Sequence, residues 1–374
     1  MLMPIVSTIV CESYELDLAR RAVNEALAPL GGIGRFVRPG MKVLLKPNLL
    51  AAADLERAIT THPALVQAVV ELVKKAGGTV LIGDSPGGPV KQSPSVWRKG
   101  GMTRAVEQTG ARLAVFDGVT WKRLNGNDYF IANPVLEADL IINLPKLKTH
   151  ALTLYTGAVK NLFGAIPGTR KREIHLRAPG VQDFSQALVD VLELVQPGLT
   201  IIDGVLGQEG NGPGMGGTPH QYGCLAASAD SVALDAVIAQ ALGYRPGEVL
   251  HLAQAEERGL GTASLDQIDI VGERQALDFG VVDLPKAHWY FRVPSWASAP
   301  LRKAARVRPL LDPSKCIGCG RCAEVCPPEI ITPGHPPEFD LSGCIGCLCC
   351  TEICPEGALT PRRNWVAKLV GVGV

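Results

Sequence analysis

Short apolar runs alternate with longer amphipathic stretches over about the first 280 residues. The apolar runs are rich in β-branched residues, and several end at Gly, Asp, Asn or Pro, which is typical of buried parallel strands. We expect strands at Ile5–Val10, Lys42–Leu45, Thr79–Ile82, Arg112–Phe116, Asp139–Asn143, Thr200–Ile202 and Ile268–Val271. We expect helices at Leu16–Leu30, Pro63–Ala76, Thr103–Thr109, Phe184–Val195, Ser231–Leu242 and Glu248–Arg258. The alternation predicts a layered α/β domain around a mostly parallel sheet.

Local turn signals refine this pattern. The His62-Pro63 pair predicts a helix start. The residues around Asn125-Gly126 predict a hairpin over Trp121–Ile131 that is inserted into the strand–helix order. The Gly-rich run Gln208–Gly217 predicts either a mobile lid over a site or a plain surface loop.

Changes in composition divide the chain into four parts. Residues 1–282 carry the α/β pattern, and residues 283–311 form an aromatic and basic linker. Residues 312–362 hold a cysteine-rich module, which we expect to be a small α+β domain, and residues 363–374 form a tail. The linker aromatics could pack between the two domains or contact a partner or a membrane surface.

Overall composition excludes few classes of function. Hydrophobic residues make up 47% and charged residues 20% of the chain, with a net charge of +1, as in ordinary globular proteins. This balance does not favour nucleic acid as a partner. We find no apolar run long enough to span a bilayer and no signal-peptide pattern at the N-terminus, and so we expect a cytoplasmic location.

Nine of the 11 cysteines lie between Cys316 and Cys354. Two segments, from Cys316 to Pro327 and from Cys344 to Pro355, share the spacing C-x2-C-x2-C-x3-C-P. A dense cluster in a long chain indicates metal ligation rather than disulfides. Zinc prefers two separated C-x2-C pairs and does not need a third cysteine in each loop. The spacing therefore favours iron–sulfur clusters.

The module resembles two-cluster bacterial ferredoxins over about 50 residues. The resemblance implies two [4Fe–4S] clusters and an external protein as electron donor or acceptor. It implies that Cys316, Cys319, Cys322 and Cys354 bind one cluster, and that Cys344, Cys347, Cys350 and Cys326 bind the other. Cys349 is an extra cysteine, because the spacing selects Cys350 as the ligand. The direction of electron flow does not follow from the spacing.

Polar segments follow several predicted strands of the large domain, at the sheet edge where open α/β folds bind ligands. The stretch 146–177 is strongly basic, which favours an anionic ligand such as a carboxylate or phosphate, although its last part could be a solvated surface run. Asp84 could instead cap a helix or bind a metal. No phosphate-binding or dinucleotide fingerprint is present in the sequence. The candidate ligand-binding residues are Lys46, Asn48, Asp84, Lys146, Lys160 and Asn161, and the candidate catalytic residues are Lys148 and His150.

Five short motifs in these segments resemble the iron–sulfur proteins grouped as domain of unknown function 362. They read KPN, HP, GDSPGG, LPKLKTH and TGAVKNLFG, and the resemblance covers most of residues 4–275. That family is thought to be distantly related to the N-terminal region of nickel-pincer lactate racemases. The relation implies an α/β fold but does not imply racemase activity.

These features lead to the hypothesis of an iron–sulfur oxidoreductase that passes single electrons between its clusters and an anionic small molecule. Lys148 and Lys160 would hold the anion, and His150 would donate a proton, because a histidine pKa near neutrality suits that role. Two alternatives stay open. The chain could be an electron-carrier subunit without its own substrate, or a metal-dependent, non-redox enzyme like the racemase relatives.

Overall fold

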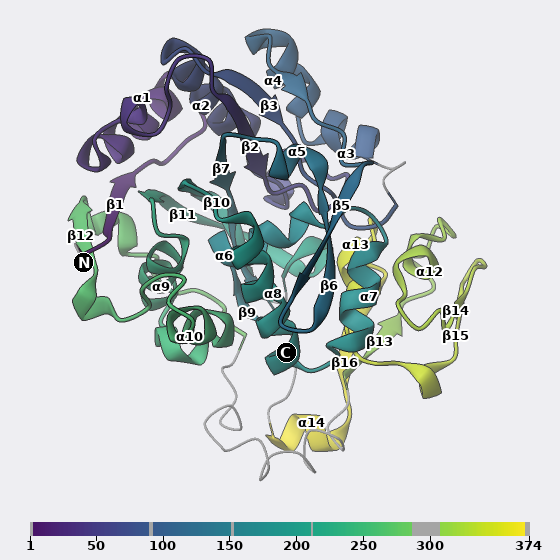
Figure 1. Ribbon diagram of the computed structural model, residues 1–374. Coiled ribbons are helices and arrows are strands. Elements are labelled where there is room, and N and C mark those ends of the chain that lie inside the picture. The colour runs from purple at the N-terminus through teal and green to yellow at the C-terminus, as the bar shows by residue number, and fades with distance from the viewer. Residues whose placement is uncertain (1–2, 90–92, 151–152, 211, 286–306, 371–374) are drawn as a thin grey trace.

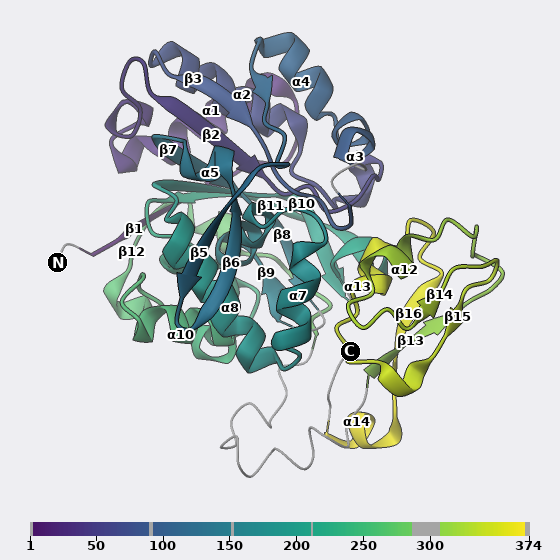
Figure 2. The ribbon, with the colours of Figure 1, turned by 45° about the vertical axis from the view of Figure 1, so that its right-hand side comes forward.

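The computed structural model describes residues 3–89, 93–150, 153–210, 212–285 and 307–370, without the side chains of 368–370. A twisted sheet lies at the centre of the large domain, with helices on both faces (Figure 1). The cysteine-rich domain lies against one side of the large domain, next to α7 Arg170–Arg177 (Figure 2). Within these residues, no helix has both the length and the apolar character needed to cross a bilayer.

The main path of the central sheet has the order β12-β1-β11-β10-β7-β2-β3-β4. From β10 to β4 all neighbours are parallel, whereas β11 is antiparallel to both β1 and β10. The strand β8 extends beside β10 and pairs with β9. The strands are β1 Ile5–Val10, β2 Lys42–Pro47, β3 Thr79–Ile82, β4 Arg112–Leu113, β7 Leu140–Leu144, β8 Lys146–His150, β9 Leu154–Thr156, β10 Leu199–Gly210, β11 Gly217–Ser228 and β12 Asp269–Gly272.

Helices cover the two faces of this sheet and create two separate cores. In β2, Val43 and Leu45 pack on one face with α1 to α4, while Leu44 packs on the other with α5 to α10. Strands buried on both faces read as continuous apolar runs, which is why the sequence pattern finds them. The helices are α1 Leu16–Leu27, α2 Pro63–Lys75, α3 Ser93–Lys99, α4 Met102–Thr109, α5 Asn133–Leu136, α6 Ala158–Asn161, α7 Arg170–Arg177, α8 Val181–Val195, α9 Ser231–Ala241 and α10 Leu250–Glu257.

The predicted α/β fold with a mostly parallel sheet is confirmed, and each predicted strand and helix has a counterpart in the structure. The predicted hairpin is formed by β5 Val119–Leu124 and β6 Asn127–Ala132, with Asn125 and Gly126 both at positive φ. The Gly-rich run predicted as a lid or loop is mostly ordered structure instead. It holds the ends of β10 and β11, which pair with each other, and a 3₁₀ turn at Gly214–Gly216.

The described part of the cysteine-rich domain contains two antiparallel strand pairs and two short helices, and a third helix follows in the C-terminal tail. Strand β13 Val307–Leu311 pairs with β16 Leu359–Arg363, and β14 Ile331–Thr332 pairs with β15 Glu338–Phe339. Residues 307–311, which the composition assigns to the linker, are therefore part of a strand. The linker residues 286–306 lie outside the described residues. The helices are α12 Arg321–Val325, α13 Cys349–Ile353 and α14 Trp365–Val370.

Polar and apolar contacts join the two domains. The Arg172 guanidinium on α7 donates to the carbonyl oxygens of Glu324 and Pro327, at 3.5 and 3.4 Å, and to Glu329 Oε1 at 2.7 Å. Val325 and Ile353 pack with Ala51 and the partly buried Leu50 of the large domain. A Cβ at Gly214 would lie 2.6 Å from the carbonyl oxygen of Glu352, so the hairpin approaches α13 closely.

We expect Arg172→Ala to weaken the docking of the cysteine-rich domain, because it removes three hydrogen bonds to that domain. A loss of about 1 kcal/mol corresponds to roughly fivefold faster amide hydrogen exchange in residues 321–331. Arg104→Ala, at an exposed position on α4, is the control and should exchange like the parent protein. Equal exchange in both variants would show that Arg172 does not hold the domains together.

Candidate functional site

A cavity lies between the two domains, at the carboxyl edge of the parallel strands. Its lining comes from the segments after β2 and β3, from β8 and β9, from α6 and α7, and from the ends of α12 and α13. Its empty volume is about 1010 Å³, including the part that opens to solvent. Open α/β folds favour small-molecule sites at this edge of the sheet.

Six of the eight residues predicted for the site line this cavity: Asn48, Asp84, Lys148, His150, Lys160 and Asn161. Lys46 and Lys146 do not, because each ammonium is directed into a buried ion pair. The Nζ of Lys46 lies 2.7 Å from Asp84 Oδ1, and that of Lys146 lies 2.9 Å from Asp203 Oδ2. A ligand-binding role for these two lysines stays a prediction, and their position favours structural support.

The Lys46–Asp84 pair joins three segments under the cavity. Lys46 Nζ also donates to the Asn161 carbonyl at 2.5 Å, and Asp84 Oδ2 accepts the backbone N–H of Leu49 at 2.8 Å. Gly164 packs directly against the pair, since a Cβ there would lie 1.9 Å from Asp84 Oδ1. The glycine is therefore needed for close approach rather than for a special φ.

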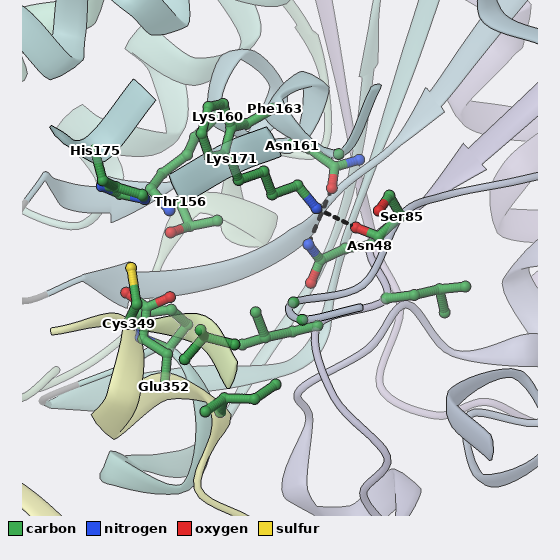
Figure 3. A pocket seen from close by; sticks show the side chains of 18 of the residues that line it. Asn48, Ser85, Thr156, Lys160, Asn161, Phe163, Lys171, His175, Cys349 and Glu352 are labelled. Atoms are coloured by element: carbon green, nitrogen blue, oxygen red, sulfur yellow. Dashed lines mark hydrogen bonds between the residues drawn. The ribbon is translucent and has the colours of Figure 1, made fainter. Parts of the chain in front are cut away.

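A chain of amide side chains positions Lys148. Asn161 donates to Asn143 Oδ1 at 2.8 Å, and Asn48 donates to Asn161 Oδ1 at 3.0 Å (Figure 3). Asn48 Oδ1 then accepts from Lys148 Nζ at 2.5 Å, and the Ile59 carbonyl accepts from the same atom at 2.8 Å. The ammonium is thus held at the cavity wall by neutral groups, without a paired carboxylate in the described residues.

Two further hydrogen-bond donors of the cavity are the hydroxyl of Thr156 on β9 and the ammonium of Lys160 on α6. Asp235 accepts from Tyr155 Oη and from the N–H groups of Ala158 and Val159, which fixes the start of α6. Lys160 follows on this helix. Within the described residues its ammonium has neither a hydrogen bond nor an ion pair. The buried hydroxyl of Thr156 likewise has no hydrogen-bond partner there.

Several cavity residues were missed by sequence reasoning. Lys171 and His175 come from α7, whose basic run could equally have been a solvated surface. Cys349 and Glu352 come from α13 of the other domain and face Thr156, Lys160 and His175 across the cavity (Figure 3). The basic run was a usable signal for α7, but no pattern in the sequence indicates which surface of the cysteine-rich domain meets the large domain.

Burial lowers the pKa of the cavity cations. The pKa of Lys148 falls to about 7 through desolvation and the charges of Lys160 and Lys146, and that of Lys171 falls to about 8, chiefly through desolvation. The pKa of Lys160 is also lowered by burial. Because both desolvation and the neighbouring lysines disfavour its charged form, the pKa of His150 lies well below the ordinary value. This direction argues against His150 as a group that titrates near neutral pH.

The cysteines surround two smaller cavities in the pattern that the ferredoxin resemblance implies. One is lined by Cys316, Cys319, Cys322 and Cys354. The other is lined by Cys326, Cys344, Cys347 and Cys350. In each case three cysteines from one loop face the fourth cysteine of the other loop, which is the donor set that a [4Fe–4S] cluster needs. The residues present therefore fit two such clusters.

The two loops also repeat one backbone conformation. Gly318 and Gly346 both adopt positive φ, of 67° and 72°, and so do Gly320 and Leu348, with 72° and 61°. Leu348 thus occupies a left-handed position that its counterpart fills with glycine. Each loop also begins with an aspartate that accepts the N–H and hydroxyl of the second residue after it, at Asp312 and Asp340.

The two cysteine centres differ in their surroundings. Cys347 lines both its own small cavity and the large cavity between the domains. The other centre includes Cys319, which is exposed to solvent. One centre therefore adjoins the large cavity between the domains, and the other faces outward.

Nothing in the described residues brings three His, Cys, Asp or Glu side chains together as a site for a single metal ion. His62, at the predicted helix start, stacks on Tyr14 with ring centroids 3.7 Å apart. Its Nδ1 accepts the N–H of Ala64 at the start of α2. This residue therefore acts as a helix cap.

Comparison with known proteins identifies the class and then the family. A 4Fe–4S dicluster domain matches residues 308–355, so this is an iron–sulfur protein. The family described as a domain of unknown function (DUF362) matches residues 43–240, and the chain belongs to that family.

Individual relatives add context. The chain is 38% identical over 264 residues to a thylakoid-associated protein of Synechocystis sp., covering 70% of this chain and 81% of that one. Two solved structures are more distant. The lactate racemase apoprotein from Thermoanaerobacterium thermosaccharolyticum has 12% identity and a TM-score of 0.36 over 54% of this chain and 50% of that one. A structural-genomics protein from Thermotoga maritima has 11% identity and a TM-score of 0.35 over 64% and 58%.

We expect Gly164→Ala to destabilise the protein by about 3 kcal/mol or more, because the new methyl group would separate a buried ion pair. Urea unfolding followed by circular dichroism measures the effect. Gly34→Ala is the matched control, since nothing lies within 4 Å of its Cβ, and it should change stability by no more than about 0.5 kcal/mol. Similar stabilities for both variants would contradict the role given to the Lys46–Asp84 pair.

Proposed function

We propose that this protein transfers single electrons between two [4Fe–4S] clusters and an anionic small molecule bound between its domains. An external protein would serve as electron donor or acceptor. The observation that carries the proposal is the shared lining of the cavity, in which Cys347 and three lysines surround one space. Bound clusters supply one-electron transfer at potentials tuned by hydrogen bonds and solvent exposure.

The proposed ligand sets follow the two small cysteine cavities. One cluster would be held by Cys316, Cys319, Cys322 and Cys354, and the other by Cys344, Cys347, Cys350 and Cys326. The different solvent exposure of the two cysteine centres gives the proposed order of electron transfer. The external protein would exchange electrons near Cys319, and the anion would exchange them near Cys347.

Charge around the large cavity supports an anionic ligand. Lys148, Lys160 and Lys171 line it, whereas the carboxylate of Asp84 is already paired with Lys46. Glu352 is the remaining carboxylate in the lining and lies 3.5 Å from His150 Nε2. A bound anion would stabilise the ammonium groups, because its contacts replace part of the hydration that these groups lose on burial.

Proton supply in this proposal shifts from His150 to Lys148. A general acid works best when its pKa is close to the working pH, and Lys148 has a pKa of about 7. His150 is neutral at that pH and would act as a hydrogen-bonding group beside the anion. Each two-electron reduction would consume two protons and two electrons taken one at a time from the external donor, and oxidation would reverse this.

The alternative of an electron-carrier subunit without its own substrate is favoured by one feature. Ile317, next to the exposed cysteine centre, is 58% exposed and would suit contact with a partner protein. The two proposals differ in whether the lysine-lined cavity binds an anion.

A cytoplasmic location is also part of the proposal. The name of the Synechocystis relative adds a contact with thylakoids as an alternative setting.

We expect Cys326→Ala to remove the cluster next to the ligand cavity and to leave the other one. Iron would fall from about eight to about four atoms per chain after anaerobic reconstitution with iron and sulfide. Electron paramagnetic resonance of the reduced protein should then lose the magnetic coupling between two clusters. Cys349→Ser is the control and should keep full iron, because Cys349 is outside both ligand sets. Loss of the outward-facing cluster in Cys326→Ala would refute the crossed assignment.

We expect Lys148→Ala to weaken anion binding by roughly tenfold, since it removes one charge-assisted contact, and His150→Ala to weaken it less. In the parent protein the affinity should fall as pH rises from 6.5 to 9. Lys148 and Lys171 lose their charge through pKa values of about 7 and 8, and the anion binds their charged forms. Calorimetric titration with benzoate or phosphate measures both effects.

Iron content serves as the internal control for these two variants and should be unchanged. An affinity that is independent of pH and of both substitutions would mean that the anion does not bind in this cavity.

A further inference from the structure

Two donors in the large cavity have unused hydrogen-bonding capacity. Thr156 is only 4% exposed, and its hydroxyl has no partner in the described part of the chain. The Lys160 ammonium also has none there. Buried polar groups are almost always paired, and so the unpaired Thr156 hydroxyl, beside the half-buried Lys160 ammonium, indicates a place for an acceptor. A carboxylate can accept from both at once.

The strand pairing places Thr156 at the cavity wall. Thr156 on β9 is the antiparallel partner of Lys148 on β8, and opposite residues in such a pair project from the same face. The lining includes both side chains. Figure 3 shows Thr156 and Lys160 near each other, on the side of the cavity that faces Cys349 and Glu352. An acceptor held there would lie close to the cysteine centre that includes Cys347.

Aromatic rings form the wall beside these donors. His175 stacks on Phe184 with ring centroids 4.6 Å apart and an interplanar angle of 19°. Phe163 meets both rings edge-on, at 5.8 and 5.3 Å. Burial lowers the pKa of His175 to about 3, so its ring is neutral and behaves as part of the aromatic wall. The lining also includes Leu50 and Ile353, which add an apolar surface.

We propose that the ligand is a planar, conjugated carboxylate, with its carboxylate on Lys160 and Thr156 and its flat body against Phe163 and His175. The inference rests on the proposed function and names its substrate class. Flat rings and conjugated chains pack well on aromatic faces and edges, whereas a puckered aliphatic body does not. A conjugated system also suits single-electron chemistry, because it spreads an added electron over several atoms. The matching reaction adds two electrons and two protons across a conjugated C=C bond, with the electrons supplied singly by the external protein donor.

Calorimetric titration of the full, iron-loaded chain with benzoate, cyclohexanecarboxylate and inorganic phosphate tests this class. The first two probes share a charge and a similar size but differ in planarity. We expect benzoate to bind at least fivefold more tightly than either of the others. Equal affinity for the two carboxylates would overturn the planar class while leaving the anion-binding function intact. Failure of all three probes to bind would overturn both.

Variants test the placement of the carboxylate. Thr156→Val should weaken benzoate binding about fivefold, Thr156→Ser should restore it, and Lys160→Met should weaken it more strongly. Thr153→Val is the matched control, because Thr153 is equally buried but outside the cavity lining, with its hydroxyl on the Tyr155 carbonyl at 3.1 Å. The control should keep the parent affinity. Equal weakening in Thr153→Val and Thr156→Val, or no weakening in Thr156→Val, would overturn the assigned position.

Discussion

The buried ion pair between Lys46 and Asp84 is the constraint on which the site depends. Both groups are almost fully removed from water, and such a pair is tolerable only when its remaining hydrogen-bonding capacity is satisfied. The Asn161 carbonyl and the Leu49 N–H satisfy it, and these groups come from the same segments that line the cavity. The pair thereby fixes the ends of β2 and β3 against α6, while Gly164 leaves just enough room for it. The cavity residues are held in place, because a movement of these segments would expose the buried charges of Lys46 and Asp84.

A second balance of charge acts between the domains. Three lysines face a surface that carries Glu352 and a cysteine centre; Lys148 is buried, and Lys160 and Lys171 are half-buried. Burial lowers the pKa of each lysine, whereas the charge of Glu352 raises the pKa of Lys148 and of Lys160. An anionic centre next to the cavity favours their charged forms, and the lysines in turn favour its negative charge. The docking of the cysteine-rich domain, held by Arg172 and by Val325 and Ile353, is thus electrostatically coupled to the state of the cavity.

The sequence predicts the sheet well and the site only in part, for identifiable physical reasons. Strands such as β2 are buried on both faces and leave a continuous apolar signal, whereas β8 contains Lys146, Lys148 and His150 and reads as a loop. The motif spacing indicates which polar residues approach the sheet edge, yet it cannot separate Lys46, whose charge is paired beneath the cavity, from Lys160, whose charge faces it. That distinction depends on Asp84 and Gly164, which are 80 positions apart in the sequence, meeting in the fold, and no local pattern records this contact.

The cavity residues that are hardest to predict from the sequence are those that come from the cysteine-rich domain. Glu352 and Cys349 lie within a repeat whose spacing is explained completely by cluster ligation, so nothing local marks them as cavity residues. Their counterparts in the first loop are Glu324 and Arg321, which do not line this cavity. The repeat is therefore symmetric in backbone and in cysteines but not in environment. Among the described residues, only its second loop contributes cysteines to the lining of the large cavity. A two-centre module docked in this way has an inner and an outer end, and the asymmetry arises from the contact surface rather than from the cysteine pattern.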